Sequence, residues 1–252
     1  MFDLRLIRAD ALKLRRRRGM LALCAVLTFG ILTLIFIVTG LQHASDPFQH
    51  PPAGGFESYQ NNMVLLMLMM LVVGAIVGAT AGAQDLESGV FRDLAATGRS
   101  RLALFGARTP GAWAIVLPIA ALGAAVVAVF SLTMADGVPG PTTAMIISGT
   151  AGALASGALS SAVSVGLAAL TGSRAAVITA MLAFTLALAP LLSGIKFLGD
   201  ARQAIPTSAL LRIGDAPDQV IHMGLFTAIV VCLGWGAAAL AVGAWRTRAR
   251  EI

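Results

Sequence analysis

Six long apolar runs, separated by short polar stretches, make up most of the 252-residue chain. A helix needs about 20 consecutive apolar residues to cross the hydrocarbon core of a bilayer. Each run approaches or exceeds that length, and the shortest, the fifth, ends near Pro190. The pattern predicts one all-α transmembrane domain over residues 1–252. Its six spans are expected at about residues 20–41, 63–83, 112–134, 144–171, 175–192 and 220–245.

Two segments outside the runs show a different pattern. Near the N-terminus, apolar side chains recur at the spacing of a helix, at Leu4, Ile7, Ala11 and Leu14. Because cationic residues occupy other positions of that helical wheel, we expect a short amphipathic helix in the membrane interface. Before the last run, residues 193–222 combine apolar pieces with prolines and glycines. This segment is too interrupted to span, so shallow re-entrant or surface helices on the outer side are expected.

The composition also indicates a membrane protein. Hydrophobic residues make up 58% of the chain and charged residues 12%, and the mean hydropathy is +0.86. A soluble domain normally has about 25% charged residues. We therefore expect an integral, multi-pass protein of a cell membrane, with a bacterial plasma membrane as the expected location.

Lysine and arginine are distributed unequally between the two sides that six spans define. Fifteen of the 18 fall on the side of the two termini, and the other three are Lys196, Arg202 and Arg212. The positive-inside rule then places both termini in the cytoplasm. Anionic lipid head groups attract basic residues at a membrane edge. The run KLRRRRG therefore indicates contact with membrane lipid, and no nucleic-acid partner is expected.

Several kinds of chemistry are missing from the sequence. It has no GxxxxGK[ST] phosphate-binding loop and no catalytic motif, and Cys24, Cys232 and the three histidines lack the spacing of metal ligands. No Asp, Glu, Lys or Arg lies within a predicted span, which disfavours an ion-coupled carrier. We expect no enzyme activity, metal or cofactor in this chain. If the protein transports, its energy is expected to come from another subunit.

Small residues recur at every fourth position in two of the runs. The second run has Gly74, Gly78 and Gly82, and the fourth has Ser148, Gly152, Ser156, Ser160 and Ser164. Small residues at this spacing allow helices in a membrane to approach closely. Helix packing is the favoured interpretation of both stripes. The serine hydroxyls leave a second interpretation open, the wall of a translocation path.

A charged stretch at residues 81–108 separates the second run from the third. Acidic residues favour a helix N-terminus, where the backbone carries partial positive charge, so Asp85 and Glu87 predict that a short helix begins there. Gly98 suits the end of this helix. One face of it is apolar and contains Leu86, Val90, Phe91 and Leu94. We expect an amphipathic helix on the cytoplasmic side, continuous with the second span.

The stretch DLESGVFRDLAATGRSR resembles the membrane subunit of type-2 exporters of the ATP-binding cassette (ABC) class. In that family an acidic residue ends the second span, followed by Gly-Thr, a basic residue, leucines and a Pro-x-Ser-Arg-like turn. The matching residues are Asp85, Gly89, Arg92, Leu94, Ser100 and Arg101. Val90 replaces the usual Thr, Gly98 stands where Pro is common, and Arg108 stands where a basic residue often opens span three.

A second stretch, AIPTSALLRIG, is similar to the Leu-Pro-x-x-Ala segment that precedes the last span in the same family. Ile205, Pro206 and Ala209 are the matching residues. The resemblance covers the whole chain in the order of its elements. It implies a dimer of membrane subunits, identical or different, with two cytoplasmic ATPase subunits that bind ATP and Mg²⁺.

The resemblance also implies that the charged stretch is a coupling helix that contacts the ATPases. The candidate contact residues are Asp85, Glu87, Ser88, Gly89, Arg92, Asp93 and Arg101. The low polarity of the spans favours export of an apolar or amphipathic compound, such as a drug, an antibiotic, a lipid or a hydrophobic peptide. Two alternatives stay open: an ATP-independent secondary carrier, and a scaffold or regulatory subunit that transports nothing.

Overall fold

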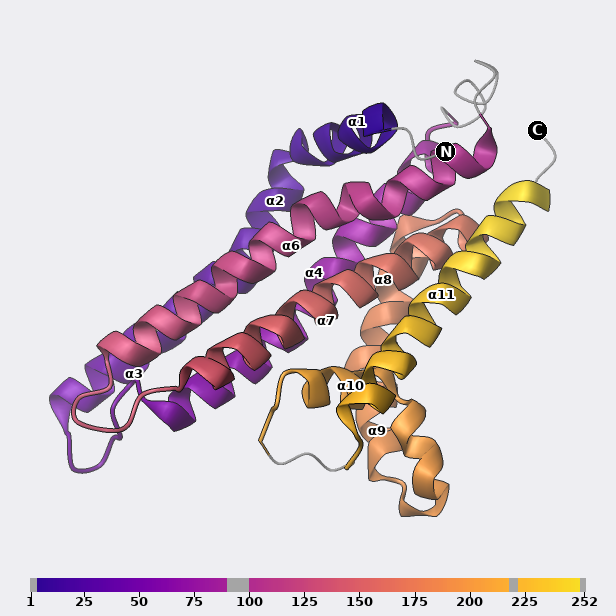
Figure 1. Cartoon of the computed structure of the whole chain (residues 1–252). Coiled ribbons are helices and arrows are strands. Elements are labelled where there is room, and N and C mark those ends of the chain that lie inside the picture. Colours follow the sequence, from indigo (N-terminus) through magenta and orange to yellow (C-terminus); the bar gives the residue numbers. More distant parts are fainter. Residues whose placement is uncertain (1–3, 90–99, 218–221, 250–252) are drawn as a thin grey trace.

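The computed structural model describes residues 4–89, 100–217 and 222–249. Every regular element in these ranges is a helix (Figure 1). In chain order they are α1 (Leu4–Arg15), α2 (Arg18–Ala25), the π-helical turn η1 (Val26–Gly30), α3 (Ile31–Ser45), α4 (Phe56–Glu87), α6 (Arg101–Thr133), α7 (Thr143–Thr171), α8 (Arg174–Ala183), the π-helical turn η2 (Phe184–Leu188), α9 (Ala189–Gly194), the 3₁₀ helix η3 (Lys196–Ala204), α10 (Pro206–Ile213) and α11 (Leu225–Ala249).

Six helical segments are long and apolar enough to cross a membrane, which confirms the predicted number of spans. They are Arg18–Ser45, Phe56–Glu87, Arg101–Thr133, Thr143–Thr171, Arg174–Gly194 and Leu225–Ala249. The second and third begin well before their predicted starts at residues 63 and 112. Hydropathy marks the apolar part of a helix only, and these two helices continue into polar sequence beyond it.

The helix ends have local causes. The side chains of Ser100, Thr142 and Ser173 each accept a backbone N–H from the first turn of α6, α7 or α8, which satisfies a donor that has no partner within the helix. After α7, Gly172 adopts a left-handed conformation with φ 69°. This conformation ends a helix and favours glycine.

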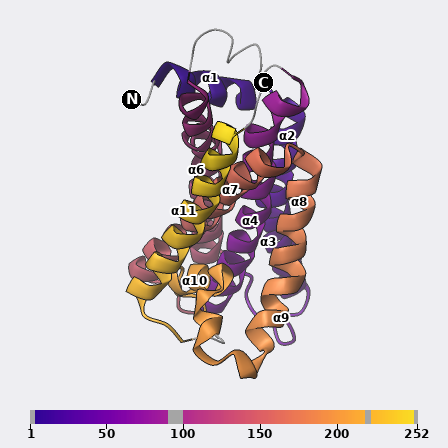
Figure 2. The same cartoon turned by 90° about the vertical axis from the view of Figure 1, so that its right-hand side faces the viewer.

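The helices α4 and α7 form the centre of the bundle. They pack along each other, and α6 packs against both. The largest cluster of buried apolar residues lies among these helices and includes Leu66, Met70 and Val116. In Figure 2 the helix α1 lies across one end of the bundle, whereas α8 and α11 lie on its periphery. The two short helices η3 and α10 occupy the segment before α11, and α10 packs against α7 and α11.

The prediction that a new helix begins at Asp85 and Glu87 is wrong. Both residues belong to the last turn of α4, and Gly89 follows in a left-handed conformation with φ 75°. The prediction used a local rule, in which acidic residues favour the positive end of a helix. In the structure the acidic residues lie at the negative end of α4, and neighbouring helices compensate for this. The rest of the predicted helix, with Arg92, Asp93, Leu94 and Gly98, lies outside the described residues.

Candidate functional site

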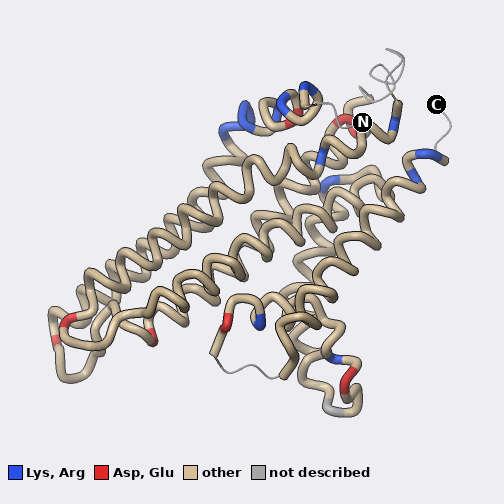
Figure 3. The backbone as a smooth tube through the Cα atoms, in the orientation of Figure 1, with Lys and Arg blue, Asp and Glu red and all other residues tan. Residues whose placement is uncertain are grey.

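Lysine and arginine gather at one end of the bundle (Figure 3). We call this the basic end; it comprises α1, the C-terminal ends of α4 and α11, and the starts of α6 and α8. The opposite end comprises the loops at residues 46–55 and 134–142. These loops are joined by backbone hydrogen bonds, such as the one that Gly54 N donates to the Met134 carbonyl at 2.8 Å.

Charged side chains from three helices meet at the basic end. Lys13 Nζ of α1 lies 3.3 Å from Asp85 Oδ2 of α4 and 3.5 Å from Asp10 Oδ1 of its own helix. Arg108 of α6 approaches the same carboxylate, with Nη2 3.9 Å from Asp85 Oδ2. The Nη1 group of Arg108 donates a 2.7 Å hydrogen bond to the Gly82 carbonyl of α4. This group of four, called the Asp85 cluster below, connects α1, α4 and α6.

Arg108 is the most deeply placed member of the Asp85 cluster, with 2% of its surface exposed. It lies within the span Arg101–Thr133, and Asp85 lies within Phe56–Glu87. Both residues lie outside the predicted spans 63–83 and 112–134, in parts of α4 and α6 that continue beyond the apolar centres of these helices. A buried guanidinium is costly unless acceptors surround it. The Gly82 carbonyl accepts the hydrogen bond of Nη1, and the Asp85 carboxylate supplies an opposite charge 3.9 Å from Nη2.

Asp10 of α1 is the second acidic member of the Asp85 cluster. Burial raises the pKa of its carboxyl group above the ordinary value, and the nearby Asp85 carboxylate acts in the same direction. The positive charges of Lys13 and Arg108 oppose this shift without reversing it. Two acidic groups therefore share two basic groups at the junction of α1 with the bundle.

Glu87 joins the end of α4 to a different helix. Its Oε1 accepts a 2.5 Å hydrogen bond from the backbone N–H of Arg174, the first residue of α8. A carboxylate is favourable at this position because the N-terminus of a helix carries partial positive charge. Asp85 and Glu87 thus bind elements of their own chain, on two sides of α4.

The other candidate contact residues lie near the same end. Ser88 is exposed, and its hydroxyl donates a 3.0 Å hydrogen bond to the Gln84 carbonyl. A Cβ atom added at Gly89 would meet no atom of the described residues within 4 Å. Arg101 is half-buried at the start of α6. Arg92 and Asp93 lie outside the described residues. The described ones, Ser88, Gly89 and Arg101, lie at the end of α4 and the start of α6 at the basic end.

The glycine stripe of α4 lies against α7. A Cβ atom added at Gly74 would lie 2.8 Å from the Gly157 carbonyl oxygen, and one added at Gly82 would lie 2.5 Å from Ala168 Cβ. At Gly78 the added atom would meet the backbone of Ser161. The backbones of the two helices are therefore in direct contact along this line, which is the packing expected of small residues in a membrane.

Three of the four candidate path serines lie inside the protein, in α7. Ser160 Oγ donates a 2.5 Å hydrogen bond across to the Leu71 carbonyl of α4, and Ser156 Oγ donates a 2.8 Å bond to Gly152 of its own helix. Ser164 is fully buried, and its Oγ meets no hydrogen-bond partner among the described residues. Their burial favours a role in packing between α4 and α7 over direct contact with a passing solute.

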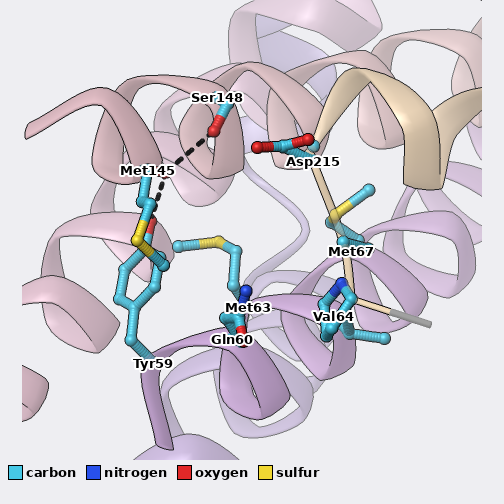
Figure 4. Close-up of a pocket in the computed structure, with 11 residues that line it drawn as sticks. Tyr59, Gln60, Met63, Val64, Met67, Met145, Ser148 and Asp215 are labelled. Atoms are coloured by element: carbon cyan, nitrogen blue, oxygen red, sulfur yellow. Dashed lines mark hydrogen bonds between the residues drawn. The ribbon is translucent and has the colours of Figure 1, made fainter. Parts of the chain in front are cut away.

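Ser148, the fourth, lines a small pocket near the opposite end (Figure 4). Its hydroxyl and that of Tyr59 both donate to the Met145 carbonyl, at 3.1 and 3.0 Å. The pocket also includes Met63, Met67 and Asp215 and measures about 10 Å³. This is the space of about one water molecule, so the pocket is too small for a transported compound.

Two larger cavities differ in chemistry. One, of about 350 Å³, lies among α4, α7, α8, η2, α10 and α11 and has an almost entirely apolar wall. The other, of about 650 Å³, lies at the opposite end. Its polar lining residues include Gln42, His50, Glu57, Asn61 and Asn62. Beside it, His43 Nε2 lies 2.9 Å from Asp136 Oδ2 and Nδ1 lies 2.7 Å from the His50 carbonyl oxygen, which joins the two loops.

A comparison with models of known protein families and with curated proteins found no match to the chain. The helices themselves define the class: this is an all-helical, multi-pass integral membrane protein with six candidate spans. In the part of the chain that the structure describes, no group of three or more His, Cys, Asp or Glu residues is placed to hold a metal ion.

Sequence reasoning missed two features of the site. The first is the contact of Asp85 with Lys13 and with Arg108, which lie 72 and 23 positions from Asp85 in the sequence. Opposite charges just outside three apolar runs were the available signal, but nothing in the spacing pairs them. The second is the apolar cavity. Its lining residues have the same hydropathy as lipid-facing ones, so only the packing of the helices reveals it.

Proposed function

We propose that the chain is the permease subunit of an ATP-driven exporter of the ABC class, working with separate cytoplasmic ATPase subunits and a second membrane subunit. The sequence resemblance suggests the class, and the Asp85 cluster is the observation that carries the proposal. An ATPase that moves the segment after α4 acts on a point that α1, α4 and α6 share. Through Glu87 it acts on α8 as well.

The proposed mechanism uses α4 as a lever. Its 32 residues correspond to a length of about 48 Å at 1.5 Å per residue, from the basic end to the opposite end. Because α4 and α7 touch backbone to backbone, a tilt of α4 carries α7 with it. Switching between inward and outward access is then a movement of packed helices, with the basic end in the cytoplasm and an apolar or amphipathic compound as cargo.

The Asp85 cluster disfavours the secondary carrier. Carriers coupled to ions use ionisable groups inside the membrane that bind and release the ion. Asp85 instead pairs with Lys13 of α1 and lies 3.9 Å from Arg108, and Arg108 donates a hydrogen bond to the Gly82 carbonyl of α4. The scaffold alternative makes the opposite prediction to ours in the experiment below, since it requires no ATP-dependent movement of any compound.

Two glycines offer a matched test of coupling. Gly89 and Gly137 both have positive φ, 75° and 85°, and within the described part of the chain a Cβ atom added to either meets nothing within 4 Å. They lie at opposite ends of the molecule, after α4 and in the loop at residues 134–142. Valine is strained in this region of backbone space, so either substitution disturbs its own turn without a steric clash.

The measurement is ATP-dependent export from cells or vesicles that contain the chain together with the ATPase that co-purifies with it in the presence of Mg²⁺ and ATP. We expect Gly89→Val to insert normally but to reduce export and cargo-stimulated ATP hydrolysis together. Gly137→Val should leave both close to wild type. Equal effects of the two substitutions contradict coupling at the basic end. Failure of any ATPase to co-purify, with transport retained, contradicts the proposed class as a whole.

A further inference from the structure

The apolar cavity among α4, α7, α8, η2, α10 and α11 is a site that the proposed function does not use. Its volume of about 350 Å³ falls within the range of about 300–1,000 Å³ that is typical of small-molecule sites. Its wall includes Leu159, Met181, Phe184, Leu210, Trp235 and Val242. The rings of Phe184 and Trp235, both in this wall, have centroids 6.0 Å apart.

The few polar groups of the wall leave little for a polar ligand to bind. Ser160 Oγ already donates to the Leu71 carbonyl, and Trp235 Nε1 donates a 2.9 Å hydrogen bond to the Ala204 carbonyl. The hydroxyls of Thr185 and Thr207 are the other polar side-chain groups of the wall, and no charged residue lines it. An occupant of this cavity is therefore hydrocarbon, with its polar part elsewhere.

Access to the cavity comes from the side of the bundle. The helices α8 and α11 both pack against α7, and in Figure 2 they lie apart from each other on its two sides, with α10 between them. Both are largely exposed along their apolar length, since the most apolar part of the α8 span is 17% buried and that of α11 is 6% buried. Surfaces of this kind face the acyl chains of a bilayer.

We propose that this cavity binds one acyl chain of a membrane phospholipid, which enters sideways between α8 and α11. The bilayer supplies the occupant because the exposed sides of both helices are apolar and the wall has no group to hold a head group. The proposal does not depend on the ABC assignment, because a scaffold or a carrier with the same helices has the same cavity.

The strength of binding follows from packing and not from exclusion of water. A chain that leaves the bilayer for the cavity exchanges one apolar environment for another, so the hydrophobic effect contributes little. The gain comes from closer van der Waals contact with a fixed wall. We therefore expect a several-fold preference for the cavity over the outer surface of the same helices, and faster exchange than for a ligand held by charge.

The test uses the full chain in nanodiscs of phosphatidylcholine that contain a small fraction of phosphatidylcholine with a diazirine in the middle of one acyl chain. After illumination, labelled peptides are mapped by mass spectrometry. We expect several-fold more label at Met181, Leu210 and Val242 than at Leu233, which is 67% exposed on α11 and does not line the cavity. Equal labelling of cavity and outer positions in the wild-type protein overturns the proposal.

Neighbouring alanines of α11 supply matched variants. Ala238 lines the cavity and Ala237 does not, and both are exposed in the bundle. We expect Ala238→Phe to fill the cavity and to lower labelling of Met181 several-fold, whereas Ala237→Phe leaves it unchanged. Ala180→Phe fills the cavity from α8 and repeats the test if Ala238→Phe fails to fold. Labelling that survives both filled variants contradicts the proposal.

A competition arm identifies the source of the chain. The nanodiscs already contain unlabelled phosphatidylcholine in excess, and any added amphiphile dilutes the probe everywhere, so the readout is the label at Met181 relative to that at Leu233. A free fatty acid of the same chain length should leave this ratio unchanged, since a single-chain amphiphile is not anchored beside the opening in the same way. A fall in the ratio when the fatty acid is added overturns the assignment to phospholipid.

Discussion

The contact between α4 and α7 and the region between α8 and α11 are both built from apolar helices, yet they pack in opposite ways. In the most apolar part of α4 and of α7, 67% of residues are buried, compared with 6% for α11. The buried pair is rich in glycine and serine, and the exposed pair displays large side chains such as Leu186, Leu233 and Trp245. Side-chain size, and not apolar character, decides which helices meet in this protein.

The physical reason is that lipid competes with protein for apolar surface. In water an exposed leucine favours burial, but in a bilayer the acyl chains satisfy it equally well. Close backbone contact is something that lipid cannot provide, and only small residues permit it. The contact between α4 and α7 should therefore be sensitive to one added methyl group, whereas an exposed position of α11 such as Gly234 should not be.

The largest effect is expected from Gly78→Ala in α4. The added Cβ atom meets the backbone of Ser161, which cannot move aside as a flexible side chain can. Overpacking of this kind typically costs about 1–3 kcal/mol. The matched control is Gly234→Ala in α11, where an added Cβ meets nothing within 4 Å. Thermal unfolding in detergent should show a lower midpoint for the first variant and an unchanged or slightly raised one for the second.

The Gly234 control also isolates helix propensity. Alanine is favoured over glycine in a helix interior by about 1 kcal/mol, and both substitutions gain this term. Equal unfolding midpoints for the two variants would mean that the close approach of α4 and α7 does not limit stability.

An effect of similar size is expected from Arg108→Gln, which breaks the Asp85 cluster. The variant loses the charge beside Asp85 and the hydrogen bond to the Gly82 carbonyl, and leaving a buried partner unsatisfied costs about 1–3 kcal/mol. The control is Arg246→Gln at the exposed end of α11, where surface substitutions usually cost within about 0.5 kcal/mol. Hydrogen exchange should show that α1 loses protection in the first variant only.

This experiment shows whether Arg108 holds α1 against the bundle or only stabilises the contact between α4 and α6. If α1 keeps its protection in Arg108→Gln while the global unfolding midpoint falls, then Arg108 stabilises α4 and α6 but does not hold α1. The lever proposed above would then begin at α4 alone.

Two serines of α7 refine the comparison further. Ser160→Ala removes a hydrogen bond to the Leu71 carbonyl of α4 and should lower stability by about 0.5–1.5 kcal/mol. Ser164→Ala removes a buried hydroxyl that has no hydrogen-bond partner within the described part of the chain, so its effect should be close to zero or stabilising. A loss for Ser164→Ala equal to that for Ser160→Ala would indicate that Ser164 binds something, which would restore the translocation-path interpretation.

The smallest effect is a pH dependence from Asp10. Its folded pKa is raised above the ordinary value of 3.8, so ionisation opposes the folded state. That penalty is absent below the unfolded pKa and fully present above the folded one, which means that wild-type stability falls as pH rises through this window. Asp10→Asn should not show this fall. Parallel pH profiles for the two proteins, measured by unfolding in detergent, would contradict the shift.

The number of spans could be predicted from the sequence, but the polar contacts between the helices could not. Run length alone predicted six spans because crossing a bilayer sets a minimum length. The ends of α4 and α6 were misplaced because helices continue past the apolar part, where Ser100 and Gly89 decide the boundary. Asp85 and Glu87 were assigned to a helix start by a local rule, whereas their partners Lys13, Arg108 and Arg174 come from three other elements. Pairing of that kind is a property of the folded chain.

The apolar cavity also could not be predicted from the sequence. Small-residue stripes can be read from spacing, since a contact between helices requires them. A cavity arises where the large side chains of neighbouring helices do not touch, and the spacing of residues along the sequence does not indicate where this happens. Leu159 and Val242 look the same in the sequence whether they face lipid, protein or a cavity.

Single-residue insertions and deletions have a defined place to act in spans one and five. Each contains a π-helical turn, η1 and η2, and such a turn holds one residue more than the α-helical turn it replaces. Deleting one residue from Phe184–Leu188 restores the α-helical repeat, and because the extra residue lies within one full rotation, the two halves of the span keep nearly the same faces while the span shortens by about 1.5 Å. The same deletion in a regular α-helical part of the span has no such turn to absorb it and rotates one half relative to the other by about 100°. Spans one and five therefore each contain a point where the length of the helix can change while the side chains that face Trp235 and the rest of the bundle stay in place.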